Sequence, residues 1–321
     1  MTGPTVVLTR CHRYEGQAFT EAIRRQFDLL GVSRLVRSGD TVLLKPNLIA
    51  PSAPEAAVQT HPAVIIEAAR LIKDLGARPL VGDSPAWGTV HSCARAMGLD
   101  GPLKALGVPL RALDRPRPCR LGDGRTVVSI SSVALDADVV INLPKFKAHQ
   151  QLMFTFAVKN LFGCVSGKRK PYWHFARGGS AGQFCEFLIE VYKVVSPAVT
   201  IIDGITAMEG PGPIRGQARH LGWLIGGTDP MGCERVCAQL VDANPEQIPL
   251  IRTARRIGFG CHDPSGIALV GDDPAGGICR DLVIPPQIPI RFSLARVAKS
   301  TAKGILISLK RPERRLCGTS S

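Results

Sequence analysis

Short apolar runs that end in polar residues and alternate with amphipathic segments constrain the fold of this chain most. Runs of this length and composition are typical of strands buried on both faces of a sheet. The predicted strands cover residues 5–8, 40–44, 79–81, 139–141, 199–202, 221–225 and 267–270. Helical periodicity covers residues 17–30, 63–75, 183–194, 231–241 and 247–257. This alternation predicts an α/β fold with a mostly parallel sheet and helices on both faces.

Length and composition suit a globular protein. The chain has 321 residues, 45% of them hydrophobic, which is enough for a sizeable core. Its apolar runs are shorter than a bilayer-spanning helix requires, and its first residues lack the charged-then-apolar pattern of a secretory signal. We therefore expect a cytoplasmic protein, with one α/β domain over residues 1–290.

Residues 291–321 form a basic tail. They contain eight Lys and Arg residues and one Glu, so this segment carries half of the chain's net charge of +14. Apolar residues between these cations predict an amphipathic segment that would contact an anionic membrane surface or an acidic partner, such as a ferredoxin. A solvated, loosely attached terminus is the alternative. Because the remaining body is only moderately basic, the charge argues against a nucleic-acid-binding protein.

The ten cysteines are scattered and include no C-x-x-C pair. Iron–sulfur clusters are normally held by closely spaced cysteines. The cysteine spacing in this chain therefore does not support a bound iron–sulfur cluster.

Residues 138–175 concentrate positive charge directly after a predicted strand. The run at 139–141 is interrupted at Asn142 and Pro144, because proline cannot continue a central strand. Cationic and imidazole side chains then follow with hardly an acidic residue: Lys145, Lys147, His149, Lys159, Lys168, Arg169, Lys170 and His174. Open α/β sheets bind ligands at the carboxyl ends of their strands, so this segment predicts one wall of an anion-binding site.

We predict a helix over residues 151–162, which carries Lys159. Apolar residues occupy most of its surface, so the lysine has two alternatives. Its ammonium group either extends to the surface or meets an anion inside the protein.

Several predicted strands end in residues that bind charged ligands. These residues are Lys45, Asn47, Asp83, Asn142, Lys145, Asp203 and Asp229. In a parallel sheet all carboxyl ends lie on one edge, so the side chains would converge there. The alternative is that Asp and Asn simply form the turns that follow strands.

Seven motifs resemble one prokaryotic family, named domain of unknown function 362. They follow one another over roughly residues 5–270: LLKPN (43–47), THPAVI (60–65), GDSP (82–85), INLPKFKAH (141–149), VKNLFGCVSGKRKPYWH (158–174), DGITAMEGPGP (203–213) and TDP (228–230). Many members carry an added ferredoxin-like module and are described as iron–sulfur proteins. This chain lacks the cysteine pattern of that module, so the resemblance implies iron–sulfur chemistry only through a separate partner.

The resemblance also implies a set of site residues without assigning their roles. These are Lys45, Asn47, His61, Asp83, Asn142, Lys145, His149, Lys159, Asn160, Trp173, His174, Asp203, Glu209 and Asp229.

Chemistry suggests roles for these residues. Lysine binds carboxylates and phosphates as a point charge, and histidine titrates near neutrality, where cationic neighbours favour its neutral form. Predicted catalytic residues are His149, His174 and Lys159. Predicted substrate-binding residues are Lys45, Asn47, Asn142, Lys145, Lys147, Asn160, Lys168 and Trp173.

Four carboxylates are candidates for a divalent metal, which binds oxygen ligands. They are Asp83, Asp203, Glu209 and Asp229. The alternative is that some of these carboxylates neutralise the lysines in ion pairs.

These observations favour an enzyme that binds a phosphorylated or carboxylated small molecule in a cleft lined by Lys, His and Asp, with or without a divalent metal. One alternative is a redox protein that works with a separate ferredoxin. Another is a non-catalytic protein that binds an anion or nucleic acid.

Overall fold

A mixed sheet of ten strands organises the protein, as seen in a computed structural model that describes residues 4–166, 170–261 and 263–290. The strands are β1 (Thr5–Arg10), β2 (Thr41–Pro46), β3 (Arg78–Asp83), β4 (Leu110–Ala112), β7 (Val139–Leu143), β8 (Lys145–His149), β9 (Met153–Thr155), β10 (Val199–Glu209), β11 (Gln217–Gly227) and β12 (Ala268–Gly271). A separate hairpin pairs β5 (Pro116–Arg120) with β6 (Val127–Ser131).

Most neighbouring strands of the sheet run parallel. Along the order β12-β1-β11-β10-β7-β2-β3-β4, only β11 runs antiparallel to its two neighbours, β1 and β10. Strand β8 pairs with β10 and forms an antiparallel hairpin with β9. The predicted mostly parallel α/β sheet is confirmed.

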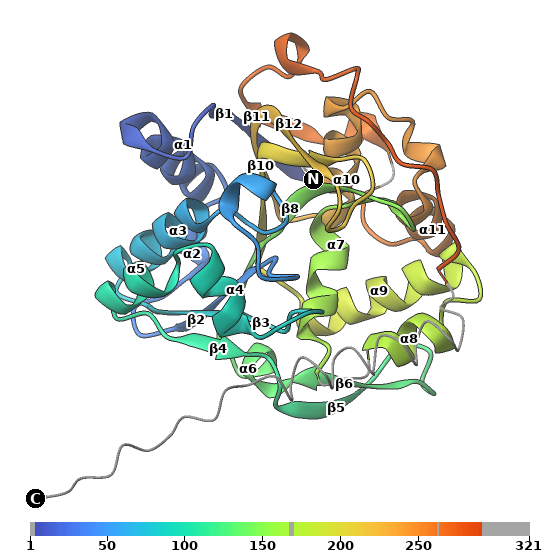
Figure 1. Ribbon diagram of the computed structural model, residues 1–321, viewed down its shortest axis with the longest axis horizontal. Helices are drawn as coiled ribbons and strands as arrows, with labels where there is room; N and C mark the ends of the chain where they lie inside the picture. The colour runs from blue at the N-terminus through green and yellow to red at the C-terminus, as the bar shows by residue number, and fades with distance from the viewer. Residues whose placement is uncertain (1–3, 167–169, 262, 291–321) are drawn as a thin grey trace, which may run out of the picture.

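Helices cover both faces of the sheet (Figure 1). On one face lie α1 (Gly16–Leu29), α3 (Pro62–Asp74), α4 (Val90–Ala96) and α5 (Asp100–Ala105), and on the other α7 (Ala157–Asn160), α9 (Ala181–Val195), α10 (Pro230–Leu240) and α11 (Pro249–Ile257). Consecutive residues of β2 alternate between the two cores: Leu43 packs in one, and Val42 and Leu44 pack in the other. Both faces of the sheet are therefore buried in hydrophobic cores. Three shorter helices are α2 (Val32–Leu35), α6 (Ser132–Leu135) and α8 (Lys170–Ala176).

The predicted helix over 151–162 is wrong in its first half. Residues 153–155 form β9, α7 is a single turn, and a 3₁₀ turn follows at Leu161–Cys164. Met153 has φ = 67°, which no α-helix allows, and β9 pairs with β8. Phe156 also packs on Phe146 of β8, with ring centroids 4.5 Å apart. Cross-strand pairing and aromatic packing thus prevail over local helical periodicity.

The described helices include none that combines the length and the apolar character needed to traverse a bilayer. The predicted tail at 291–321 and the predicted substrate-binding residue Lys168 lie outside the described residues.

Candidate functional site

The candidate site is a pocket beside β8, β9 and α7, next to the points where β2 and β7 end. It encloses about 270 Å³ of empty space, counting the part open to solvent, and is lined by Asn47, Ile49, Pro144, Lys145, Lys147, Thr155, Phe156, Lys159, Asn160 and Pro213. Asn47 follows β2 and Pro144 follows β7, which are adjacent parallel strands. The lining thus contains three lysines and, among the described residues, no carboxylate.

Strand β8 places cationic side chains at the pocket because successive side chains of a strand point to opposite faces. Lys145, Lys147 and His149 share one face of the strand, whereas Phe146 and Ala148 pack in the hydrophobic core. The three polar side chains are only 2–3% exposed. Burying lysine and histidine this deeply costs free energy unless partners compensate for the lost water. The partners of each lysine therefore indicate its role.

Lys45 is paired with Asp83. Its Nζ lies 2.8 Å from Asp83 Oδ1, and both side chains are almost completely buried. The second carboxylate oxygen of Asp83 accepts a hydrogen bond from the Leu48 backbone N–H at 2.7 Å. Gly163 packs so closely that an added Cβ would lie 2.7 Å from Lys45 Nζ and still closer to Asp83 Oδ1. This pair is a closed, internally neutralised unit.

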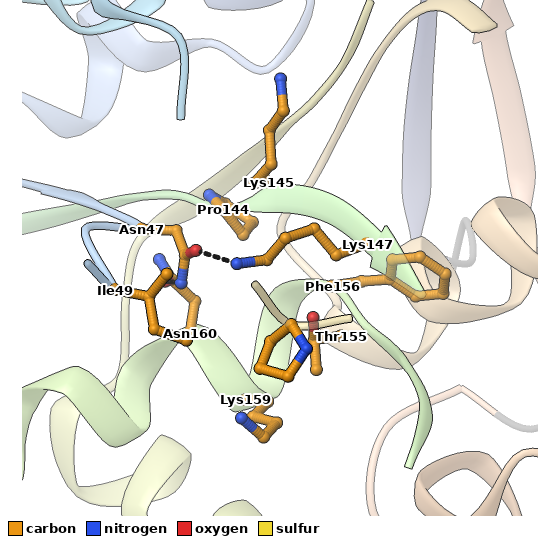
Figure 2. Close-up of a pocket in the computed structure, with 10 residues that line it drawn as sticks. Asn47, Ile49, Pro144, Lys145, Lys147, Thr155, Phe156, Lys159 and Asn160 are labelled. Atoms are coloured by element: carbon orange, nitrogen blue, oxygen red, sulfur yellow. Dashed lines mark hydrogen bonds between the residues drawn. The ribbon is translucent and has the colours of Figure 1, made fainter. Parts of the chain in front are cut away.

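Lys145 is paired with Asp203. Its Nζ lies 2.8 Å from Asp203 Oδ2, which also accepts from the His61 backbone N–H at 2.9 Å. The Tyr14 hydroxyl donates to Asp203 Oδ1 at 2.7 Å and accepts from Lys145 at 3.0 Å. Burial and the Asp203 charge raise the pKa of Tyr14 well above 10. Lys145 lines the pocket, but its ammonium group points away from the other two lysines (Figure 2).

His61 packs against this second ion pair. The ring of His61 stacks on Tyr14, with centroids 3.6 Å apart, and its Nδ1 accepts from the Ala63 backbone N–H at the start of α3. Burial lowers the pKa of His61 to about 4. Tyr14 was not among the predicted site residues, because its partner Asp203 is 189 positions away in the sequence. No local pattern marks such a contact.

Lys147 is held by neutral oxygens. Its Nζ donates to Asn47 Oδ1 at 2.5 Å and to the Val58 carbonyl at 2.8 Å (Figure 2). Burial, followed by the charge of Lys159, lowers the pKa of Lys147 well below 10.5. The Lys147 ammonium group therefore has hydrogen-bond acceptors but, within the described part of the chain, no carboxylate partner.

A chain of amides supports Lys147. Asn47 Nδ2 donates to Asn160 Oδ1 at 3.0 Å, and Asn160 Nδ2 donates to Asn142 Oδ1 at 2.8 Å and to the Lys45 carbonyl at 3.0 Å. Asn142 Nδ2 donates in turn to the Ala157 carbonyl at 2.9 Å. The amide groups of Asn142 and Asn160 are thus occupied within the protein, which suits residues that position α7 rather than residues that contact a ligand.

Lys159 differs from the other three lysines of the site in its contacts. It is partly buried on α7, and in the part of the chain that the structure describes its ammonium group has no hydrogen-bond or ion-pair partner. Burial lowers the pKa of Lys159 to about 8. The buried hydroxyl of Thr155 also lacks a partner among those residues, and Figure 2 places it between Lys147 and Lys159. The pocket therefore contains an unsatisfied cation and an unsatisfied hydroxyl.

The two predicted catalytic histidines lie near Lys159. Burial, then the charges of Lys159 and Lys147, lower the pKa of His149 well below 6.5, and burial with Lys159 lowers that of His174 to about 3. His149 Nδ1 accepts from the Gln151 backbone N–H at 3.0 Å. The neutral ring of His149 therefore carries its proton on Nε2, and that nitrogen is a donor rather than a base.

Trp173 packs beside these residues on α8. Its ring stacks on Phe187 with centroids 4.7 Å apart, and its buried Nε1 has no hydrogen-bond partner among the described residues. Trp173 is not among the residues that line the pocket.

The four predicted metal carboxylates do not come together. Asp83 and Asp203 each neutralise a lysine, and Glu209 accepts from the Val283 backbone N–H at 3.0 Å. Asp229 caps α10 through the Gly232 N–H, because β11 is antiparallel and directs its carboxyl end toward the opposite edge of the sheet. The prediction that Asp229 joins the shared edge is therefore wrong.

The described residues contain no group of three or more His, Cys, Asp or Glu side chains placed to hold a metal ion. A divalent metal and an iron–sulfur partner stay predictions.

A further carboxylate, that of Glu234, contacts the start of α7. Glu234 on α10 is 1% exposed, and its Oε1 accepts from the Val158 backbone N–H at 3.1 Å, at the beginning of α7. Burial raises the pKa of Glu234 to about 8. Glu234 was not predicted as a site residue, because a single acidic residue in an apolar helix gives no signal of a contact with another helix.

Comparison with known proteins shows the family of this chain. The family described as "Domain of unknown function (DUF362)" matches residues 42–239 of the chain. A thylakoid-associated protein of Synechocystis sp. (strain ATCC 27184 / PCC 6803 / Kazusa) is 36% identical over 307 residues, which cover 94% of this chain and 95% of that protein. The chain belongs to the DUF362 family. The resemblance seen in the sequence motifs is therefore confirmed, and the pocket lysines Lys145, Lys147 and Lys159 lie inside the matched region.

Among solved structures, the lactate racemase apoprotein from Thermoanaerobacterium thermosaccharolyticum aligns with a TM-score of 0.42 and 14% identity. The alignment covers 67% of this chain and 54% of the racemase chain, so this DUF362 protein spans about half of the racemase's length.

Proposed function

We propose that this DUF362 protein is an enzyme whose pocket binds a small anionic molecule that carries a carboxylate or a phosphate. The observation that carries the proposal is the uncompensated charge of Lys147 and Lys159. Two other buried lysines, Lys45 and Lys145, have carboxylates 2.8 Å away, whereas the pocket lining described by the structure includes no acidic side chain for these two. An anion would supply the missing counter-charge.

Other groups suit the same ligand. The Thr155 hydroxyl is a free donor, and Pro213, Ile49 and Phe156 provide apolar walls that exclude water and strengthen a charge-assisted hydrogen bond. His149, whose pKa is lowered by burial and by the charge of Lys159, is not among the residues that line the pocket. We therefore assign the anion to Lys147 and Lys159, with Thr155 as a neighbouring donor.

Binding of inorganic phosphate and malonate, measured by isothermal titration calorimetry, tests the proposal. Lys159→Met and Lys147→Met should each weaken binding about 10- to 100-fold, since a hydrogen bond to a charged group contributes about 1.5–3 kcal/mol. Lys193→Met is the matched control, because Lys193 pairs with Glu190 on the surface. Equal affinities of all four proteins would exclude this pocket as the anion site.

Other expectations stay predictions. The structure does not test the cytoplasmic location. The docking of the basic tail and the partnership with a ferredoxin concern residues 291–321, which lie outside the described residues. The relative's name connects that protein with thylakoids, and a tail with eight basic residues and one acidic residue suits an anionic membrane surface.

A further inference from the structure

We infer that Lys159 is a nucleophilic amine that forms an imine with the carbonyl group of the bound anion. This inference rests on the proposed anion-binding function and specifies its substrate class, a small aldehyde or ketone that carries a carboxylate or phosphate.

The inference begins with the difference between Lys159 and the other lysines of the site. Lys45 and Lys145 each form an ion pair with a carboxylate, and Lys147 donates to two oxygens. Lys159 alone among these four has no hydrogen-bond or ion-pair partner in residues 4–166, 170–261 and 263–290. Burial favours the neutral form of such a lysine and lowers the pKa of Lys159 to about 8, which activates its amine as a nucleophile.

The two unpaired lysines of the pocket have different roles in this inference: Lys147 binds the anionic group, and Lys159 attacks the carbonyl. Lys147 is anchored by Asn47 and Val58 and stays in place to hold the anionic group of the ligand. Burial lowers the pKa of Lys159 to about 8, so part of its side chain is present as the neutral amine near neutral pH. Thr155 lies between them in Figure 2, and its unpartnered hydroxyl is available to the carbonyl oxygen.

The reaction balances without an oxidant or reductant. The Lys159 lone pair attacks the carbonyl carbon, a C–N bond forms, and the C=O electron pair moves to oxygen. That oxygen gains a proton as nitrogen loses one, which gives a carbinolamine. The hydroxyl then takes up a proton from solvent, the C–O bond breaks as the nitrogen lone pair forms the C=N bond, water leaves, and a protonated imine remains. The Thr155 hydroxyl donates a hydrogen bond to the oxygen throughout.

Buried anchoring also restricts the movement of Lys159. Helix α7 is fixed at its start by the Glu234 carboxylate and along its length by the amide chain through Asn160. Gly163 follows on the next turn and contacts the Lys45–Asp83 pair. A rigid support of this kind holds a reactive amine in one place, which is the main requirement for attack on a bound carbonyl.

Trapping with borohydride tests the inference. The protein is incubated with glyoxylate and sodium cyanoborohydride, digested, and mapped by mass spectrometry. We expect the adduct on Lys159 to exceed that on any other lysine at least tenfold, and to disappear in Lys159→Arg, which keeps the positive charge. Lys170 is the internal control, because burial lowers its pKa to about 8 as well, while its ammonium group donates to the Ser84 carbonyl.

The outcomes separate the two proposals. If phosphate and malonate bind in the pocket but glyoxylate labels Lys159 no more than Lys170 or Lys193, the imine is excluded and anion binding stands. If neither anion binds, the proposed function fails first. Lys159→Arg should unfold at the parent temperature and retain phosphate binding within about tenfold. If this variant does not fold, excess malonate that protects Lys159 from labelling in the parent protein supports the inference, and failure to protect contradicts it.

Discussion

Two pairs of lysines in one site differ in what neutralises them. Lys45 and Lys145 each have a carboxylate 2.8 Å away and form closed units within the fold. Lys147 and Lys159 share a pocket in which the described lining contains no acid. The comparison teaches that a buried lysine in this protein is structural when the chain provides its counter-ion and available for a ligand when it does not.

Removing one carboxylate should have the largest effect. Asp203→Asn leaves Lys145 buried without its counter-ion, and we expect it to lower the free energy of unfolding by about 3–5 kcal/mol. Lys159→Met removes a charge that has no protein partner in the described structure and should leave stability equal or slightly higher. Urea denaturation of both variants checks the contrast. A similar loss in the two proteins would show that the two classes of lysine do not differ.

Crowding a closed pair should have a smaller effect. In Gly163→Ala the new methyl group would meet Asp83 and lie 2.7 Å from Lys45 Nζ, so the pair must move. We expect a loss of about 1–3 kcal/mol in the free energy of unfolding. Gly101→Ala in α5 is the control, because nothing lies within 4 Å of its added Cβ. If both alanine variants are as stable as the parent protein, the Lys45–Asp83 pair is not tightly enclosed.

Glu234 is the reverse case, a buried carboxylate that has no cationic partner among the described residues. Its pKa is raised from 4.5 to about 8 by burial, so the folded state binds the proton more tightly than the unfolded state. The stability from this group is present below pH 4.5 and is lost as pH rises to about 8, at up to about 1.4 kcal/mol per pH unit. Glu234→Gln should flatten this slope in unfolding experiments from pH 5 to 8. An unchanged slope would show that Glu234 does not titrate in this range.

Sequence patterns predicted the sheet well because its strands are apolar and bounded by turn residues. The runs at 40–44, 79–81 and 139–141 became β2, β3 and β7, and residues that follow β2 and β7 line the pocket. The alternative that carboxylates neutralise lysines is realised by Asp83 and Asp203. These features depend on local pattern and on parallel strand order.

Other features depend on contacts between distant residues. Tyr14 reaches Asp203 only after β1 and β10 are brought close by the intervening β11. The segment 151–155 turns back on β8 because aromatic packing outweighs its helical periodicity. Asp229 was misplaced because periodicity does not reveal that β11 runs antiparallel. Sequence alone could not decide which lysine pairs with which carboxylate.

Proton uptake on anion binding tests the central contrast most directly. Lys147 has a pKa well below 10.5 in the free protein, because burial and Lys159 disfavour its charge, and a bound anion should restore that charge. Titration of malonate at pH 8 in two buffers of different ionisation enthalpy should give a net uptake of protons in the parent protein. Lys147→Met should bind more weakly and take up fewer protons than the parent, whereas Lys193→Met should match the parent. Binding without proton uptake in the parent protein, or equal uptake in Lys147→Met, would contradict the account.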